Sequence, residues 1–303
     1  MTVAEPWPAL PLEEWSDTHA TLHLWLQIVG KVRLRQSPWL NHSWHSTLYV
    51  TPSGLSTSSM PYGDRVFEIE FDFRDHALHV RASDGAAKAF PLGPYSVAAF
   101  HARLMQALKE LGLEVRISRM PNEIEHPIRF DVDETHRSYD ADYANRYWRI
   151  LVQADRVFRA FRSPFIGKAS PSHFFWGAPD LAVTRFSGRA APVHPGGVPH
   201  LPDAVAQEAY SHEVSSAGFW AGGGPVPYPA FYSYAYPEPA GFADAGVEPR
   251  EAFYSNDLHE FVLPYDAVRR APVPDDALLA FLRSTYEAAA NLGKWDRSAL
   301  ERA

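Results

Sequence analysis

The chain has 303 residues, of which 46% are hydrophobic, 14% aromatic and 21% charged, and its net charge is −8. This balance is typical of a folded globular protein rather than a disordered one, and the negative charge argues against general nucleic-acid binding. The lack of cysteine excludes disulfides, cysteine-ligated zinc and thiol catalysis.

The first predicted helix precedes Pro38. Its apolar stripe consists of Leu22, Trp25, Leu26, Val29 and Val32. Ser16 or Asp17 is expected to cap the start of this helix. Proline disfavours the helical conformation in the residue before it, so Pro38 ends the helix, and two strands are expected to follow.

An antiparallel meander comes next. Residues 66–73 alternate aromatic or aliphatic side chains with acidic ones, which predicts a strand with one wet face. Residues 77–82 and 88–92 supply two further strands across tight turns. An amphipathic helix over 100–112 then ends in Gly112, which suits the left-handed position after a helix.

The second half repeats this order after an acidic connection over 119–140. A helix carries Trp148, Leu151, Phe158 and Phe161 on its buried stripe and stops at Pro164. Strand candidates are 210–220, 230–236, 252–255 and 259–265, and a last helix over 281–293 ends in Gly293. Three Pro/Gly-rich insertions, 189–209, 221–229 and 237–249, are interpreted as ordered loops.

The two halves resemble one another. Residues 27–38 and 153–164 both begin with Gln and end with Ser-Pro, 126 residues apart. We therefore predict an α+β fold of two tandem helix–antiparallel-sheet–helix pseudo-repeats packed as one unit. Their boundaries are 1–118 for the N-terminal repeat, 119–140 for the connection, and 141–303 for the C-terminal repeat, which is enlarged by the Pro/Gly-rich loops. The alternative is chance convergence of two helix-to-strand corners.

Four segments carry a resemblance to a known family. They are WSDTHATLHLWLQIVGKVR, GKASPSHFFWGAPDLAVTRFSGR, YSHEVSSAGFW and EFVLPYDAVR. Together they resemble the bacterial domain-of-unknown-function 5996 family over nearly the whole chain. The resemblance implies a bacterial, cytosolic, single-unit protein, and it carries over no catalytic residue.

The polar faces of the two leading helices offer candidate binding residues. Gln27, His23 and Lys31 are predicted donors for an anion pocket between the repeats. Arg146, Arg149 and Arg156 surround the matching Gln153. A solvated helix face is the alternative for both groups.

The corner NHSWH contains His42 and His45, which form a weak candidate metal pair if the corner is a helical turn. No carboxylate stands at ligand spacing, so hydrogen bonds to a loop are the favoured interpretation. We predict no cofactor and consider a metal unlikely.

The strands of the second half carry most of the candidate site residues. His212 and Glu213 point to opposite faces of one strand, whereas Tyr232, Tyr234 and Tyr236 share one face of the next. This row of phenols predicts a ligand wall or, alternatively, a sheet face covered by a loop.

His173, Asp180, Thr184 and Arg185 are expected near the junction of the repeats. Arg185 is the predicted clamp for a substrate carboxylate or phosphate. The alternative is that Arg185 pairs with Asp180 or with the acidic residues 131–134.

Two functional classes follow. The favoured one is an enzyme for a small polar or anionic metabolite in a cleft between the repeats, with His212 or His173 as base and Tyr234 as acid. Its substrate-binding residues would be Arg185, Tyr232, Glu213, Gln27, His23 and Lys31. The alternative is a non-catalytic protein that binds a small molecule or a peptide in the same aromatic cleft.

The expected partner is a small molecule, without nucleic acid or membrane. The sequence has neither a secretory leader nor a long apolar run, which predicts a cytoplasmic protein. The substrate and the oligomeric state are not specified by the sequence.

Overall fold

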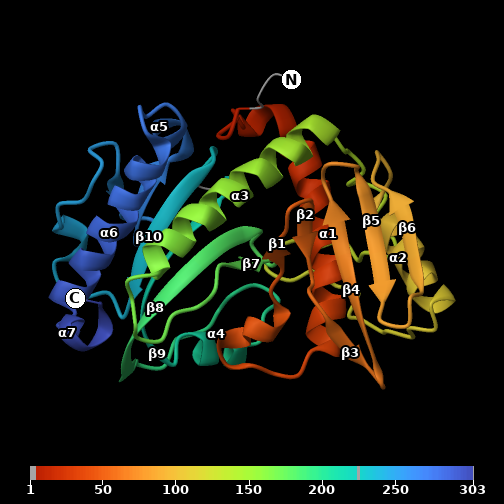
Figure 1. Cartoon of the computed structure of the whole chain (residues 1–303), viewed down its shortest axis with the longest axis horizontal. Coiled ribbons are helices and arrows are strands. Elements are labelled where there is room, and N and C mark those ends of the chain that lie inside the picture. Colours follow the sequence, from red (N-terminus) through yellow and green to blue (C-terminus); the bar gives the residue numbers. More distant parts are fainter. Residues whose placement is uncertain (1–4, 224–225, 303) are drawn as a thin grey trace.

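The computed structural model describes residues 5–223 and 226–302 and has an α+β fold. Two antiparallel sheets of six strands each lie in the two halves of the chain, with helices packed against them (Figure 1). The sheet orders are β1-β2-β4-β5-β6, with β3 also paired to β4, and β11-β12-β10-β9-β8-β7.

The elements follow the predicted order closely. The first half comprises α1 (Leu12–Gln36), the 3₁₀ helix η1 (Asn41–Ser46), β1 (Tyr49–Val50), β2 (Gly54–Ser56), β3 (Met60–Tyr62), β4 (Arg65–Asp72), β5 (Ala77–Ala82), β6 (Ala87–Pro91) and α2 (Val97–Glu110). The second half comprises α3 (Ala141–Arg162), β7 (His173–Phe175), β8 (Asp180–Ala190), α4 (Asp203–Ala209), β9 (His212–Trp220), β10 (Ala230–Tyr236), η2 (Phe242–Asp244), β11 (Phe253–Ser255), β12 (Glu260–Pro264), α5 (Tyr265–Arg269), α6 (Pro274–Leu292) and α7 (Arg297–Leu300). No helix in the described part of the chain has the length and apolarity to cross a membrane.

Helix α1 begins earlier than predicted. Its cap position is Pro11, without a side-chain cap, so Ser16 and Asp17 lie inside the helix instead of capping it. Glu13 and Glu14 in the first turn lie where the helix dipole favours negative charge, which stabilises this earlier start. The predicted end before Pro38 is confirmed.

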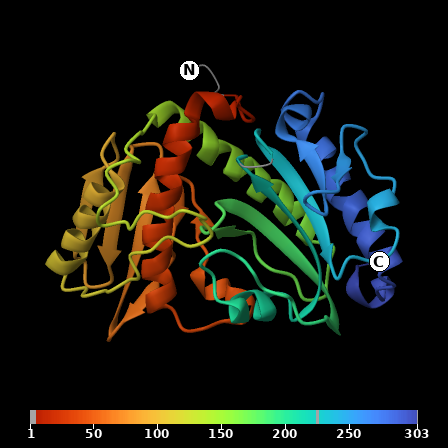
Figure 2. The same ribbon diagram turned by 180° about the vertical axis from the view of Figure 1, so that it is seen from behind.

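Helix α1 is also buried on more than its apolar stripe. The Trp25 ring is fully buried and stacks on Phe100, with ring centroids 4.8 Å apart. Gln27, on another side of the helix, is fully buried as well. Figure 2 shows α1 in red between the first sheet and the second half of the molecule. Gln27, Lys31 and Arg33 are therefore interior groups, whereas the polar side chains nearer the two ends of the helix, such as Asp17 and Arg35, are exposed.

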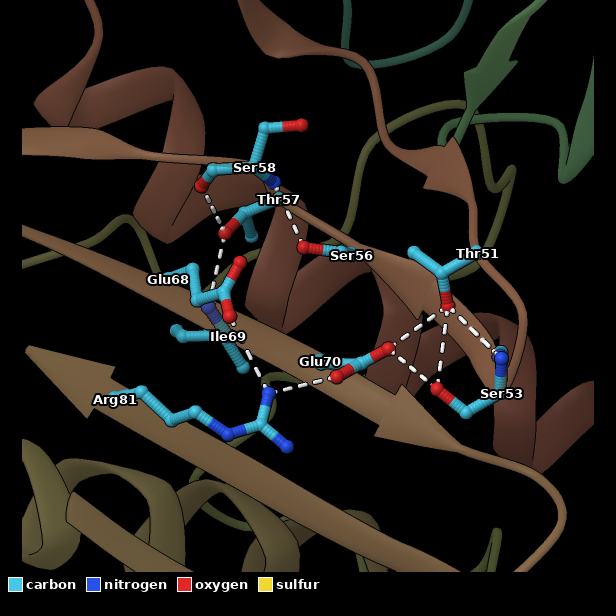
Figure 3. Close-up of polar contacts among 10 residues, drawn as sticks. Thr51, Ser53, Ser56, Thr57, Ser58, Glu68, Ile69, Glu70 and Arg81 are labelled. Atoms are coloured by element: carbon cyan, nitrogen blue, oxygen red, sulfur yellow. Dashed lines mark hydrogen bonds and ion pairs between the residues drawn. The ribbon is translucent and has the colours of Figure 1, made fainter.

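The first sheet keeps the predicted alternation, and its acidic face is partly covered. Phe67, Ile69 and Phe71 are buried on one side of β4. On the other side, the Glu70 carboxylate accepts hydrogen bonds from Thr51 (2.8 Å), Ser53 (2.7 Å) and Arg81 (2.7 Å), as Figure 3 shows. Both Glu70 oxygens are thus partnered, and this cluster ties β4 and β5 to the turn between β1 and β2.

The two helix ends that carry glycine differ. Gly112 has φ +68°, which confirms the predicted left-handed cap of α2. Gly293 has φ −73°, so the predicted cap is wrong there, and Lys294 adopts the left-handed conformation instead, with φ +52°. The Trp295 ring packs close to Gly293, and the chain turns one residue later than the glycine pattern indicates.

The Pro/Gly-rich insertions contain more regular structure than predicted. The segment 189–209 includes the end of β8 and the whole of α4, and 237–249 includes η2. In 221–229, residues 224–225 lie outside the described part of the chain. The insertion with α4 crosses one face of the second sheet (Figure 2, teal).

A backbone bridge joins the edges of the two sheets. Leu48 and Phe174 exchange backbone hydrogen bonds of 2.9 and 3.0 Å, which link the β1 edge to the β7 edge. On β8, β9 and β10 the odd-numbered residues face α3 and α6, and the even-numbered residues face α4 and η1. The latter face carries the candidate site.

Candidate functional site

A cavity of about 550 Å³ lies against the even-numbered face of the second sheet. Its floor is formed by β8, β9 and β10. One wall comes from η1 and its neighbours, a second from residues 122–123 of the connection, and the roof from α4 and residues 194–202 before it. Both halves of the chain and the connection between them therefore contribute to one partly open cavity.

Specific hydrogen bonds hold the roof in place. The His42 ring donates from Nδ1 to the carbonyl of Ala209 (3.0 Å), because a carbonyl can only accept. The Trp39 indole donates to the Glu208 carboxylate at 3.0 Å, and the Glu123 amide donates to Pro199 at 2.9 Å. The roof is thus fastened both to the η1 corner and to the connection.

The floor carries a hydrogen-bonded carboxylate and phenol. The Tyr232 hydroxyl, on β10, donates to the Asp180 carboxylate at the start of β8. The two residues lie on either side of β9, and Tyr232 reaches across Gly218. A β-carbon at Gly218 would collide with the Tyr232 hydroxyl, so glycine is required for this close approach.

Burial sets the protonation of this pair. Burial, together with the charges of Glu123 and Glu260, raises the pKa of Asp180 to about 7, whereas the Tyr232 hydrogen bond opposes the shift. Burial also holds the pKa of Tyr232 well above its usual value. At neutral pH, Asp180 can therefore exchange a proton, while Tyr232 remains a donor.

A second cavity of about 310 Å³ adjoins the first, and the two share Asp180, Tyr232 and Tyr234. Its remaining lining includes apolar side chains of β9 and β12 together with Glu260. Burial raises the pKa of Glu260 to about 7. Two carboxyl groups poised near neutrality thus line adjoining cavities.

Further hydroxyl groups extend the polar floor. The Tyr234 and Tyr210 hydroxyls are hydrogen-bonded to each other at 2.8 Å, which ties β10 to the end of the roof. The Thr184 and Ser216 hydroxyls lie 2.9 Å apart on neighbouring strands. The row of tyrosines predicted from the sequence therefore does line a cavity, through Tyr232 and Tyr234.

Glu123 brings a third carboxylate to the cavity wall. Its backbone is left-handed, with φ +59°, and its carboxylate occupies the space that a β-carbon would take at Gly177. Burial raises the pKa of Glu123, and the charge of Lys31 opposes this shift. The turn between β7 and β8 and the connection thus fit together only because residue 177 is glycine.

The residues predicted on the first helix support this wall instead of lining the cavity. The Gln27 amide accepts from the Asn122 amide (2.8 Å) and donates to the Asn122 carbonyl (2.9 Å). His23 donates from Nε2 to the Gly177 carbonyl at 2.7 Å, and Lys31 donates to the Asn122 side chain. These three side chains position the connection and the β7–β8 turn.

Arg185 points away from the cavity. It is 3% exposed, and its guanidinium carbon lies 3.6 Å from the Phe161 ring centroid and 4.2 Å from that of Tyr286. It also donates to the Phe161 carbonyl. Neither Asp180 nor residues 131–134 are its partners, because Arg185 is on the odd-numbered face of β8.

His173 and Glu213 also lie outside the cavity lining. His173 is 1% exposed, and its ring centroid lies 5.3 Å from that of Trp44 and 5.8 Å from that of Phe175, both of which do line the cavity. Burial lowers the pKa of His173 to about 3. Glu213 forms an ion pair with Arg189 at 2.6 Å on the odd-numbered face.

His212 lies at the beginning of β9, with its ring centroid 6.0 Å from that of His42. Its Nδ1 is 3.1 Å from the Ser211 hydroxyl. His42 lines the larger cavity, whereas His212 does not. His212 is therefore close to the site but outside its lining.

The candidate metal pair does not converge. His42 and Ser43 have positive φ, which breaks the helical turn on which the pairing depends. His42 accepts from Lys168 (2.6 Å) through Nε2, and His45 accepts from the Leu40 amide (3.2 Å). Across residues 5–223 and 226–302, no group of three or more His, Asp or Glu side chains is arranged to hold a metal ion.

A family model matches residues 7–302, nearly the whole chain, and its description is "Family of unknown function (DUF5996)". The chain belongs to this family. A search of curated proteins and a search of solved structures both found no match to it. For this DUF5996 chain, the chemistry of the site must therefore be argued from its own residues.

Sequence reasoning gave no chemical role to the three carboxylates of the site in this DUF5996 chain. Asp180 was expected near the junction of the repeats, but its one suggested interaction was with Arg185, which an odd spacing along a strand places on the opposite face. Glu260 and Val262 are two residues apart on β12, and this alternation indicates that their side chains point to the same face of the sheet. Glu123 lies in a connection without helix or strand, where no periodicity indicates its direction.

Proposed function

We propose that this protein is an enzyme that acts on a small molecule in the joined cavities, with Asp180 as general acid–base. The pairing of Asp180 with Tyr232 where the two cavities meet carries this proposal. A pKa of about 7 at Asp180 suits proton transfer at neutral pH. Tyr232 keeps its proton and orients the carboxylate or the ligand.

In this proposal Asp180 takes the role that the sequence suggested for His212 or His173, since neither histidine lines the cavity. Tyr234, held by Tyr210, provides a second hydroxyl toward the ligand. A volume of about 550 Å³ suits a compact molecule and favours a metabolite over a peptide.

The alternative is a non-catalytic binding protein that uses the same cavity. The aromatic character of the lining favours this role. The side chains concerned are Trp39, Trp44, Phe175, Trp176 and Phe186. In that case Asp180 and Tyr232 would only hydrogen-bond the ligand.

The two roles separate in a turnover experiment. The wild-type protein, Asp180→Asn and the control Asp257→Asn are incubated with a metabolite extract, which is followed by mass spectrometry. Asp257 is exposed in the turn before β12. Consumption of a compound by the wild type and the control but not by Asp180→Asn supports the enzyme, and equal consumption by all three contradicts it. Retention of a compound without consumption favours the binding role.

We also infer that the two halves derive from a duplication. After its Ser-Pro corner, each half has five strands that lie in the sheet in the order in which they occur along the chain, β1-β2-β4-β5-β6 and β7-β8-β9-β10-β12. The strands β3 and β11 depart from this order, since β3 pairs with β4 and β11 lies beyond β12. The bridge between the sheets joins Leu48 to Phe174, and these are also 126 residues apart, like the repeated helix ends. When two copies are related by a twofold axis, the same position of each copy can meet at that axis, as Leu48 and Phe174 do here. The boundaries at 118 and 140 stay predictions.

A further inference from the structure

The charges that line the joined cavities are of one sign. Glu123, Asp180 and Glu260 contribute carboxyl groups from three separate segments. Among the described residues that line either cavity there is no lysine or arginine. An anionic ligand would therefore meet no fixed cation in the lining, and Arg185 is on the other face of the sheet.

The carboxyl groups are only partly compensated by the protein. Asp180 accepts one hydrogen bond from the neutral Tyr232 hydroxyl. Lys31 acts on Glu123 through its charge, while its ammonium group donates to the Asn122 side chain. Burial is the cause of the raised pKa of Glu260, with no opposing cation. Buried acids of this kind gain most from a cation supplied by a ligand.

The rest of the lining suits a cation as well. Aromatic faces carry a negative electrostatic potential that attracts ammonium and guanidinium groups. Tyr210, Tyr232 and Tyr234 line the larger cavity, and Trp220 lines the smaller one. Trp44 and Trp176 also line the larger cavity, but Lys168 and Lys31 already lie over their rings. Carboxylates combined with aromatic side chains in an enclosed space are the ordinary means of recognising an organic cation.

We propose that the joined cavities bind a small organic cation, with its charged nitrogen between Asp180 and Glu260 and its body along the aromatic wall. This inference rests on the proposed function for the location of the site and adds the charge of the ligand. It replaces the anionic substrate expected from the sequence with a ligand of opposite sign.

The binding of such a cation is linked to protons. The titratable groups around Asp180 are Glu123, Tyr147, Tyr210, Tyr232 and Glu260, with Lys31 beyond Glu123 and with His42 and His194 also in the lining. Asp180 and Glu260 are partly protonated at neutral pH. A bound cation favours their ionised forms, so binding releases protons and tightens as the pH rises through about 7.

Three probes of similar size and different charge test the inference: benzylammonium, benzyl alcohol and benzoate. We expect benzylammonium to raise the Tm of the full-length protein, benzoate to have no effect, and benzyl alcohol to have a smaller effect. The benzylammonium shift should increase between about pH 6 and about pH 8, and calorimetry in two buffers should show proton release.

Charge-neutralising variants locate the binding. Glu260→Gln is expected to weaken benzylammonium binding about tenfold or more, because it removes a charged hydrogen-bond acceptor, whereas the exposed Glu125→Gln should leave binding unchanged. Unaltered binding by Glu260→Gln and Asp180→Asn together would overturn the inference. Binding of benzoate as tight as that of benzylammonium, or no response to benzylammonium at all, would overturn it as well.

Failure of this inference can be told apart from failure of the proposed function. Consumption of an uncharged or anionic metabolite that depends on Asp180 would keep the enzyme and overturn the cation. Binding of benzylammonium without Asp180-dependent consumption of any metabolite would support the cation and overturn the enzyme.

Discussion

The Tyr232 hydroxyl crosses directly over Gly218 to reach Asp180. Gly218 lies on the central strand β9, between the strands that carry the other two residues. A side chain at this position would meet both the Tyr232 ring and the Leu181 carbonyl. The proposed proton-transfer pair thus depends on a residue that has no functional group.

Replacement of Gly218 by Ala should disrupt the pair. We expect a loss of about 1 to 3 kcal/mol in the free energy of unfolding, because the β-carbon overpacks a filled site. The displaced Tyr232 should also give up its hydrogen bond to Asp180, which raises the pKa of Asp180 further. Urea unfolding measures the first effect. Gly246→Ala, at an exposed position with open space around it, is the control. Equal stability of the two variants would contradict the prediction.

Asp180→Asn should change the pH dependence of stability. The folded-state pKa of Asp180 is about 7 and its ordinary value is 3.8, so the folded state retains a proton that the unfolded state has lost. The contribution of Asp180 to wild-type stability therefore falls as the pH rises from about 4 to about 7. Asp180→Asn lacks this loss and should gain on the order of 1 to 3 kcal/mol over the wild type between about pH 5 and about pH 8. Parallel curves for the two proteins would count against a buried carboxyl.

The buried histidines change the stability of the protein with pH in the opposite direction to Asp180. Burial lowers the pKa of His173 to about 3, so the unfolded state binds a proton first as the pH falls below 6.5. At about pH 5 this costs up to about 2 kcal/mol of stability. His173→Phe removes the titrating imidazole and should therefore reduce that acid loss. Phenylalanine suits this position because the surroundings of residue 173 are largely aromatic. Unfolding at about pH 7 and about pH 5 tests this prediction, with the exposed His126→Gln as control. An unchanged acid loss in His173→Phe would refute it.

Arg185 is expected to affect stability but not ligand binding. Its guanidinium is enclosed by the Phe161 and Tyr286 rings, so Arg185→Ala should cost about 2 to 4 kcal/mol through lost packing. Arg185→Met keeps most of the volume and should keep the Tm shift produced by benzylammonium. Loss of that shift in a folded Arg185→Met would contradict this prediction.

The order of elements could be predicted from the sequence because local patterns specify it. The alternation over 66–73 and the proline after each leading helix require no tertiary information. The cap at Gly112 was predictable for the same reason. Gly293 was not, because the Trp295 ring packs against it and the left-handed residue became Lys294.

The site was harder to predict because it depends on which face each element buries. The burial of Gln27 could not be predicted from its helix alone, because the connection covers this side chain and is hydrogen-bonded to it at Asn122. The roof helix α4 is only seven residues long and lies in a segment rich in Pro and Gly. Tyr232 and Tyr234 were recognised from their alternation alone, and that part of the candidate site needed no further information.

The central claim is that burial in the cavity poises Asp180 for proton transfer. Carbon-13 NMR of the Asp180 carboxyl, assigned with Asp180→Asn, measures its titration in the wild-type protein without knowledge of a substrate. We predict a midpoint at about pH 7. A midpoint near the ordinary value of 3.8 would contradict the account.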